Sequence, residues 1–358
     1  MDGTTIGEWA TDENGQIQVR NLDEGTYVIE ELSSDGKHVI SDAPQTVYLS
    51  GKDQDVVSVY FGNVPTGSVL ITKADQLSGQ PLAGVEFFAT DSTGAVIGNA
   101  NGKFTTDASG SILIENLDPS LTVVARESKA KSSYVLDDTP QTAKVRPGET
   151  VTLRFLDKPK GNLIVEKYDK ISGERLSNAV FRVTNANGEL IADDEGLTSS
   201  NGLYTTNQEG QIVLSNVTPA TLVVTEVPPP EGYRADQTPQ TVVINPGDTQ
   251  TLRFYDDPLC TLTLFKRDAK TLRGLSGASF YVRYSDGRAI GANNGRYVTG
   301  TDGTVTITGI KPDATVLVSE ERAPSGYIKD DSVKSIVVKS GAPNSLTFDN
   351  APSTTLVI

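Results

Sequence analysis

Four times along the chain, a strand-like apolar run leads to a glutamate. In TLVVTEVPPPEGY, residues 221–233, Glu226 follows the apolar run and three prolines then break the strand. The corresponding positions are Glu320 in TVLVSEERAPSGY, Glu127 in TVVARESKAKSSY and Glu31 in TYVIEELSSDGKH. A charged group at the end of a buried strand is unfavourable unless it is paired or hydrogen-bonded. Each glutamate therefore needs a partner from elsewhere in the fold.

Two further blocks recur with the glutamates and carry the candidate partners. The first is an alternating strand with a lysine, as in VLITKADQLSGQPLAGVEF, where a phenylalanine follows the lysine by fourteen positions. The second closes each copy with Phe, any residue, Asn or Asp, any residue, and Pro. The lysines are Lys73, Lys167 and Lys266, and the closing positions are Asn63, Asp157, Asp256 and Asn350.

The length of the repeat predicts one small all-β domain for each copy. Consecutive lysines are 94 and 99 residues apart, and Gly 33 and Pro 18 favour short strands joined by turns. This spacing suits a β-sandwich. We predict domains at 67–160, 161–259 and 260–351, the C-terminal part of a truncated domain at 1–66, and the first strand of a further repeat at 352–358. The sequence is thus expected to be a window on a longer array, with no signal peptide inside it.

Composition argues against several classes of function. The net charge of -15 and the pI of about 4.6 argue against nucleic-acid binding, because phosphate contacts need a basic face. No apolar run is long enough to span a bilayer. One histidine and one cysteine leave little for a metal site or a Cys–His nucleophile, so we expect no metal and no cofactor. Cys260 is expected to be a small buried apolar side chain.

Each complete repeat combines a lysine, a glutamate and an Asn or Asp that a sandwich could bring together. One interpretation is a buried ion pair, which often adds no net stability. The other is covalent: a neutral lysine attacks the side-chain carbonyl of Asn or Asp while a protonated glutamate polarises that carbonyl. The product is an isopeptide bond, with loss of ammonia from Asn or water from Asp. The sets are Lys73–Glu127–Asp157, Lys167–Glu226–Asp256 and Lys266–Glu320–Asn350.

The combination resembles the B-type domains of Gram-positive surface proteins, the family of collagen-adhesin B-repeats and SpaA-like pilins. The resemblance is carried by the AGVEF-like lysine block, the glutamate box in SEERAPSGY and TEVPPPEGY, and the closing FxN or FxD. It covers almost the whole sequence and implies immunoglobulin-like or transthyretin-like sandwiches in an elongated array. It also implies an autocatalytic Lys–Asn/Asp crosslink in which Glu127, Glu226 and Glu320 assist.

Two copies depart from this family pattern. The stretch RESKAKSSY around Glu127 lacks the Pro and Gly of the box. Glu31 and Asn63 form an incomplete site, which has no lysine unless another chain supplies it.

Repetition and resemblance together favour a structural stalk of a bacterial adhesin or fibre. The expected location is extracellular, on the cell-wall-anchored surface of a Gram-positive bacterium, without membrane insertion. The expected partners are neighbouring repeats of the same chain, and a host ligand could bind through a domain outside this sequence. The bond-forming residues would react once each, so we expect no enzyme turnover.

Three alternatives to a stalk stay open: repeats that bind host matrix protein or glycan, a polymerising pilin subunit, and an accessory module of a secreted enzyme. Against ligand binding, aromatic residues make up 6% of the chain, and its one tryptophan, Trp9, is expected to pack in a core or at a sheet edge. Against a pilin subunit, we find no linking lysine motif and no sorting signal.

Overall fold

The computed structural model describes residues 3–52, 56–98, 101–191, 202–291 and 293–354, and every regular element among them is a β-strand. This confirms the all-β prediction. Within the described ranges, the chain forms no helix that is long and apolar enough to cross a membrane. The chain divides into two compact units, residues 1–159 and 160–358. Of the further strand expected at 352–358, residues 355–358 lie outside the described residues.

The first unit opens with two small sheets, each an antiparallel pair of strands. In one sheet β1 pairs with β3, and in the other β2 pairs with β4. The strands are β1 (Gly25–Ile29), β2 (His38–Ile40), β3 (Gln45–Leu49) and β4 (Asn63–Pro65). The prediction that Trp9 packs in a core or at a sheet edge is wrong, because its side chain is 49% exposed and lies outside any strand. Residues 3–24 form no strand, so no sheet face lies in this segment for the ring to cover.

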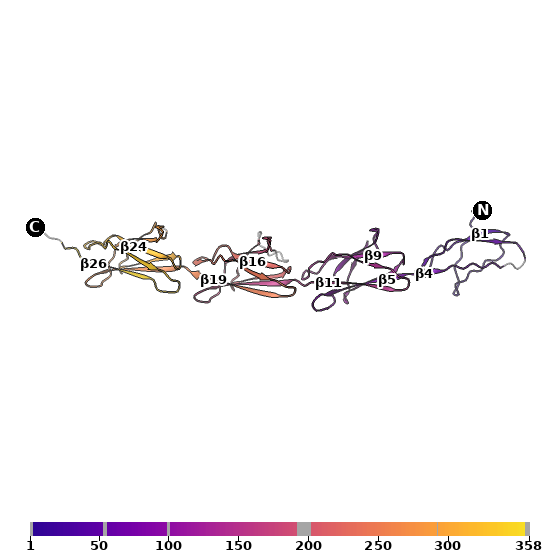
Figure 1. The fold of residues 1–358 in the computed structure, drawn as a ribbon, viewed down its shortest axis with the longest axis horizontal. Coiled ribbons are helices and arrows are strands. Elements are labelled where there is room, and N and C mark those ends of the chain that lie inside the picture. The colour runs from indigo at the N-terminus through magenta and orange to yellow at the C-terminus, as the bar shows by residue number, and fades with distance from the viewer. Residues whose placement is uncertain (1–2, 53–55, 99–100, 192–201, 292, 355–358) are drawn as a thin grey trace. The chain divides into compact units, whose positions relative to one another are not determined.

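The rest of the first unit is a sandwich of two sheets, which we call the first sandwich (Figure 1). One sheet has the order β11–β5–β8 and the other has the order β10–β9–β6–β7. The apolar side chains between them form one core, with Val69, Ile71 and Phe87 fully buried. The strands are β5 (Gly67–Asp75), β6 (Glu86–Asp91), β7 (Lys103–Thr105), β8 (Ser111–Leu117), β9 (Thr122–Lys129), β10 (Gln141–Lys144) and β11 (Thr150–Asp157).

The second unit contains two sandwiches of the same design, the second and the third (Figure 1). The second has sheets β15–β12–β19–β17 and β14–β13–β16–β18, and the third has sheets β23–β20–β26 and β22–β21–β24–β25. Each has its own apolar core, and Cys260 is buried in that of the third sandwich, as expected.

The strands of the second sandwich are β12 (Gly161–Asp169), β13 (Val180–Asn185), β14 (Leu203–Thr205), β15 (Gln211–Val217), β16 (Thr221–Glu226), β17 (Tyr233–Arg234), β18 (Gln240–Val243) and β19 (Thr249–Pro258). Those of the third are β20 (Cys260–Asp268), β21 (Ser279–Tyr284), β22 (Arg296–Val298), β23 (Thr304–Ile310), β24 (Thr315–Arg322), β25 (Val333–Val337) and β26 (Ser345–Asn350).

The first and last strands of every sandwich are neighbours and run parallel: β11 beside β5, β19 beside β12, and β26 beside β20. A parallel pair needs a long crossover connection, and here all the remaining strands of the sandwich supply it. The two strands therefore end at the same edge of their sheet, which places the C-terminal residues of both side by side.

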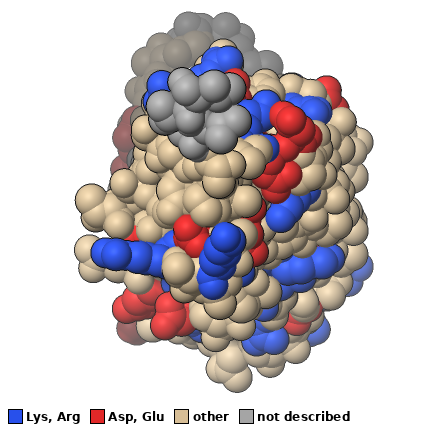
Figure 2. All heavy atoms as spheres, turned by 90° about the vertical axis from the view of Figure 1, so that its left-hand side faces the viewer, with Lys and Arg blue, Asp and Glu red and all other residues tan. Residues whose placement is uncertain are grey.

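Both signs of charge are mixed on the surface. On the face drawn in Figure 2, Lys and Arg side chains lie interspersed with Asp and Glu. Exposed neighbours pair in places, as in Arg288–Asp286 at 2.8 Å and Arg296–Glu321 at 3.1 Å. Such exposed pairs contribute little to stability, so the fold depends mainly on its apolar cores.

Candidate crosslinking sites

The lysine of each sandwich is buried on the core face of its first strand. Lys73 in β5, Lys167 in β12 and Lys266 in β20 are 2%, 0% and 0% exposed. Each is the seventh residue of a nine-residue strand whose first, third and fifth residues also face the core. Strand alternation thus places a cation in an apolar layer, where it must find an opposite charge.

The glutamate reaches this lysine from the opposite sheet. The glutamates lie on β9, β16 and β24, which belong to the four-stranded sheet that faces the lysine strand across the core. All three are buried, at 1%, 1% and 3% exposed. The lysine Nζ to carboxylate oxygen distances are 2.6 Å for Lys73–Glu127, 2.9 Å for Lys167–Glu226 and 3.2 Å for Lys266–Glu320.

The last strand brings the closing Asp or Asn to the same lysine. The Nζ of Lys73 contacts Oδ1 of Asp157, and that of Lys167 lies 2.5 Å from Oδ1 of Asp256. In the third sandwich, the lysine donates a hydrogen bond to the amide oxygen of Asn350. The structure therefore brings each of the three predicted sets together, and the bond that would join them stays a prediction.

Phenylalanines surround each buried lysine. Phe155 is the cross-strand partner of Lys73, and Phe87 is that of Glu127. The two rings lie 4.9 Å apart between centroids, with Nζ of the lysine 5.8 and 5.9 Å from them. The same ring pair lies beside the other two lysines, Phe181–Phe254 at 4.8 Å and Phe280–Phe348 at 4.8 Å. These rings exclude water, which weakens the solvation of every charge in the site.

The two sites that contain Asp hold one positive group against two carboxyl groups. The pKa of Glu127 is raised to about 7, chiefly by burial, with Asp157 adding to the rise and Lys73 opposing it. The pKa of Glu226 is raised to about 7 for the same reasons. In both sites one oxygen of the glutamate and one of the aspartate are buried without a hydrogen-bond partner. A proton shared by the two carboxyls would satisfy both oxygens and leave the site neutral.

The third site contains Asn350 and is neutral without an extra proton. The Asn350 amide nitrogen donates to Oε1 of Glu320 at 3.0 Å, while the backbone N–H of Asp330 donates to Oε2 at 2.7 Å. Burial lowers the pKa of Lys266, and Glu320 opposes this shift. A lowered lysine pKa favours the neutral amine, which is the form that can act as a nucleophile.

Glu31 and Asn63 contact each other in the N-terminal segment, and no lysine among the residues that the structure describes bonds to either side chain. The Asn63 amide nitrogen donates to Oε1 of Glu31 at 2.7 Å, and both residues are half-buried. Oε2 of Glu31 and Oδ1 of Asn63 are buried and have no partner. The structure thus places the two expected members of the incomplete site in contact, with one acceptor atom on each unsatisfied.

A tyrosine and an aspartate beside each site were missed by the sequence reasoning. In every sandwich, a tyrosine seven residues after the glutamate donates its hydroxyl hydrogen bond to an aspartate two residues after the lysine. The signal was present, because KAD, KYD and KRD follow one pattern and all three glutamate boxes end in Tyr. The pairs are Tyr134–Asp75, Tyr233–Asp169 and Tyr327–Asp268.

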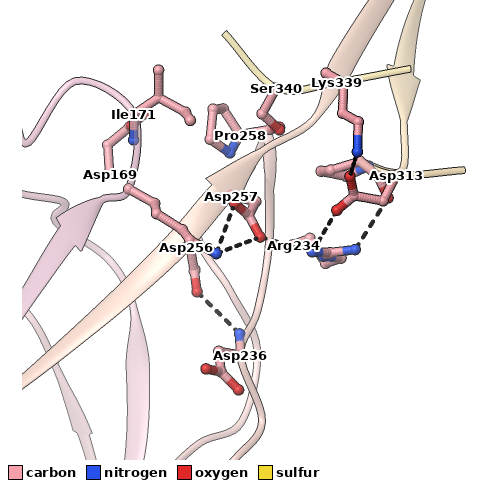
Figure 3. Close-up of polar contacts among 12 residues, drawn as sticks. Asp169, Ile171, Arg234, Asp236, Asp256, Asp257, Pro258, Asp313, Lys339 and Ser340 are labelled. Carbon is pink, nitrogen blue, oxygen red and sulfur yellow. Dashed lines mark hydrogen bonds and ion pairs between the residues drawn. The ribbon is translucent and has the colours of Figure 1, made fainter. Parts of the chain in front are cut away.

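Within the second unit, Arg234 links the edge of the second site to the third sandwich (Figure 3). Its guanidinium donates to Asp257 at 2.7 Å and to the carbonyl oxygen of Pro312 at 3.1 Å, and lies 3.9 Å from Asp313. Ser340 of the third sandwich donates to the carbonyl oxygen of Pro258 at 2.6 Å. The backbone N–H of Asp236, two residues after Arg234, donates to Oδ1 of Asp256 at 3.2 Å, so the closing carboxyl lies close to this junction.

Beside this junction is an open polar hollow of about 330 Å³. It is lined by Lys170, Arg234, Ala235, Asp236, Tyr255 and Asp257. No three His, Cys, Asp or Glu side chains in the described part of the chain are grouped to hold a metal ion.

Comparison with protein-family models matched the SpaA prealbumin-like fold domain at residues 1–65, 67–159, 161–258 and 260–352. A search of the curated proteins found no match. Among solved structures, the Bacillus anthracis TIE protein is 18% identical, with 98% of this chain and 67% of that chain covered at a TM-score of 0.39. A streptococcal ancillary pilin is 16% identical, with 81% of this chain and 100% of that chain covered at a TM-score of 0.35. BcpA, the major pilin subunit of Bacillus cereus, is 14% identical, with 80% of this chain and 100% of that chain covered at a TM-score of 0.35.

Proposed function

The chain belongs to the family of SpaA prealbumin-like fold domains, and from this premise we propose that it is a stalk on the surface of a Gram-positive bacterium. Its domains, at 67–160, 161–259 and 260–351, would each be closed by an isopeptide bond between first and last strands. The chain would then carry pulling force through covalent links, and no substrate would be turned over.

The reaction follows from the contacts within each site. The neutral lysine nitrogen attacks Cγ of the closing Asp or Asn, which is held against it by the parallel strand pairing. In the two Asp sites, the protonated glutamate donates to the closing carboxyl and stabilises the charge that develops there. In the third site, Glu320 contacts the amide nitrogen of Asn350, which is the leaving group. One proton moves from the lysine nitrogen, through the glutamate, to the leaving group. The C–N bond forms as the C–O bond of Asp or the C–N bond of Asn breaks, and water or ammonia leaves.

The observation that carries this proposal is the burial of the same three groups in three sandwiches. A plain ion pair would need only one carboxylate for each lysine, and a buried pair often adds no net stability. Here a second acyl group lies in direct contact with each lysine, and its strand register is the same in all three. Fixing the reacting atoms in this way gives the high effective concentration that an amide-forming step needs.

The test is the intact mass of the purified chain under denaturing conditions. We expect the loss of two waters, from the Asp157 and Asp256 sites, and of one ammonia, from the Asn350 site. Peptide mapping should then recover branched peptides that join each lysine to its closing residue. A mass equal to that of the unmodified chain would refute the crosslinks and leave three buried ion pairs.

Glu226→Gln tests the role of the glutamate. The amide is nearly isosteric with the carboxyl group but cannot relay a proton. We therefore expect the second sandwich to fold without forming the Lys167–Asp256 bond, so that its mass shows no loss of one water. Glu166→Gln is the matched control, because Glu166 is also buried in the second sandwich but pairs with Arg175 and Arg253 outside the site. If the mass of both variants shows the same loss of water at the second site as the unchanged protein, Glu226 is not required for the reaction.

A further inference from the structure

The same tyrosine–aspartate hydrogen bond stands beside all three crosslinking sites. The distance from the tyrosine hydroxyl to Oδ2 of the aspartate is 2.9 Å in each sandwich. The aspartates are each 7% exposed, and the tyrosines are half-buried. The same bond at the same distance in three copies of different surrounding sequence indicates that it serves something common to all three.

The aspartate fixes the end of the lysine strand. In the third sandwich, Oδ1 of Asp268 accepts the backbone N–H groups of Lys270 and Thr271, both at 2.8 Å. These bonds and the one from Tyr327 lower the pKa of Asp268 to about 2, so it is a carboxylate near neutral pH. Asp268 is also the cross-strand partner of the closing residue Asn350. Its position is therefore coupled to both reacting strands.

The tyrosine fixes the other two segments that carry reacting groups. Its backbone pairs with the closing proline, two residues beyond the Asp or Asn: Tyr134 with Pro159, Tyr233 with Pro258, and Tyr327 with Pro352. It also ends the loop that begins at the glutamate. Each tyrosine thus connects the end of the glutamate loop to the last strand through its backbone and to the end of the lysine strand through its hydroxyl.

In the first sandwich the tyrosine–aspartate hydrogen bond is present although the sequence of the glutamate loop differs from that of the other two. The stretch RESKAKSSY has neither the Pro nor the Gly of the other boxes, yet Tyr134 bonds Asp75 with unchanged geometry. The incomplete site gives the contrast. His38 stands seven residues after Glu31 and pairs with Pro65, but its ring nitrogen Nδ1 contacts Asp35 of its own loop at 2.9 Å.

We infer that these tyrosine–aspartate pairs are positioning residues for the crosslinking reaction. They hold the end of the lysine strand, the end of the last strand and the glutamate loop in fixed positions. The closing carboxyl or amide then stays in contact with both the lysine and the glutamate. This inference rests on the proposed crosslink and names what aligns its reactants. Neither the hydroxyl nor the aspartate exchanges atoms with the reacting groups.

The third sandwich offers a test with a matched control. Tyr327→Phe removes only the hydroxyl that bonds Asp268. Tyr297→Phe removes a hydroxyl that donates to the carbonyl oxygen of Ile290 at 2.8 Å. Tyr297 pairs with Phe280 in the same sandwich, but this hydroxyl bonds none of the three reacting residues. Each full chain is made by cell-free translation, synthesis is stopped, and aliquots are quenched in denaturant over time. Mass spectrometry then gives the fraction of Lys266 joined to Asn350.

We expect crosslinking in Tyr327→Phe to be slower by about tenfold or more, because small misplacements of reacting atoms cost large factors in rate. Tyr297→Phe should react at the rate of the unchanged protein. Asp268→Asn should be milder than Asp268→Ala, since its amide can still contact both the tyrosine oxygen and the turn. An unchanged rate in Tyr327→Phe, or equal slowing in both tyrosine variants, would overturn the positioning role. Absence of the bond from the unchanged protein at all times would instead refute the crosslink itself, and the positioning role with it.

Discussion

A lysine, a glutamate and an acyl side chain in one apolar site can exist as charged or neutral forms that hold the same number of protons. In the Asp sites, a charged lysine, an aspartate ion and a protonated Glu127 or Glu226 are isomeric with three neutral groups. In the third site, the ion pair of Lys266 and Glu320 is isomeric with a neutral lysine and a protonated glutamate. Reaction therefore needs internal proton transfer and no net uptake, provided that the glutamate proton of the Asp sites is present.

This difference predicts that the rates at the Asp sites and at the Asn site respond differently to pH. The raised pKa of Glu127 and Glu226, about 7, means that their protons are present below that value and are lost as pH rises through it. Crosslinking at Asp157 and Asp256 should therefore slow above about pH 7. The third site needs no such extra proton, because Lys266, whose pKa is lowered by burial, can pass its own proton to Glu320. Its rate should therefore change little between about pH 6 and 8.

Quenched time courses of newly translated chain at several pH values would measure the three rates separately. The three branched peptides differ in mass, so each sample is its own internal comparison. Parallel pH profiles at all three sites would contradict this difference in proton count between the Asp sites and the Asn site.

At the level of strands, the turn before β23 contacts the backbone of the lysine strand β20 and helps to fix its position. Gly303 has φ +76, and a Cβ there would lie 2.5 Å from the nitrogen of Leu275 and 2.6 Å from the carbonyl oxygen of Lys266. The backbone N–H of Lys266 in turn donates to the carbonyl oxygen of Gly303 at 2.8 Å. The turn and the lysine strand are therefore in direct backbone contact, with no room for a side chain.

Gly303→Ala should destabilise the third sandwich and slow its crosslinking. Gly309→Ala is the control, because Gly309 has φ +75 but nothing within 4 Å of an added Cβ. The left-handed backbone alone should cost about 1–2 kcal/mol in either variant, and the clash in Gly303→Ala should add about 1–3 kcal/mol. Hydrogen exchange of the β20 amides would measure both. Equal losses of protection would show that the backbone contact has no part in fixing the lysine strand.

Repetition and alternation were enough to predict the strands, the inward lysines and the closing residues, because period two fixes the face of each side chain. The parallel pairing of β5 with β11 could not be read from spacing, since antiparallel neighbours would give the same repeat. The Tyr134–Asp75 pair was missed because it joins residues far apart in the sequence, and each alone is ordinary: an aspartate before a turn and a tyrosine after a loop. The exposure of Trp9 could not be foreseen, because it depends on which neighbouring residues form strands.

At the scale of the second unit, Arg234 has no counterpart in the other glutamate boxes. The residue after the box tyrosine is Val135 in the first sandwich and Ile328 in the third. Only in the second sandwich does this position carry a charge that contacts the backbone of a following sandwich, at Pro312. The link is therefore a property of one junction and not of the repeat.

Arg234→Gln should loosen this junction without affecting the core of either sandwich. We expect faster hydrogen exchange at the amide of Asp313, which bonds the carbonyl oxygen of Val338 at 2.9 Å, and near residues 339–341. Arg288→Gln, which removes an exposed arginine paired with Asp286 in the third sandwich, should leave these amides unchanged. Added salt should reproduce part of the Arg234→Gln effect in the unchanged protein, because exposed charge pairs are screened. Unaltered exchange in Arg234→Gln would show that the arginine does not hold the two sandwiches together.

The parallel pairing of first and last strands also determines what kind of molecule the crosslinks would make. A bond between Lys73 and Asp157, 84 positions apart, turns the intervening backbone into a closed ring, and so does the bond between Lys266 and Asn350, also 84 positions apart. The chain enters and leaves each ring within a few residues of these bonds. A single break in the backbone inside a ring would open that ring and still leave both ends of the chain connected. The three sandwiches would then be macrocycles joined by short single strands, and within this part of the chain only cuts at the joints would divide it.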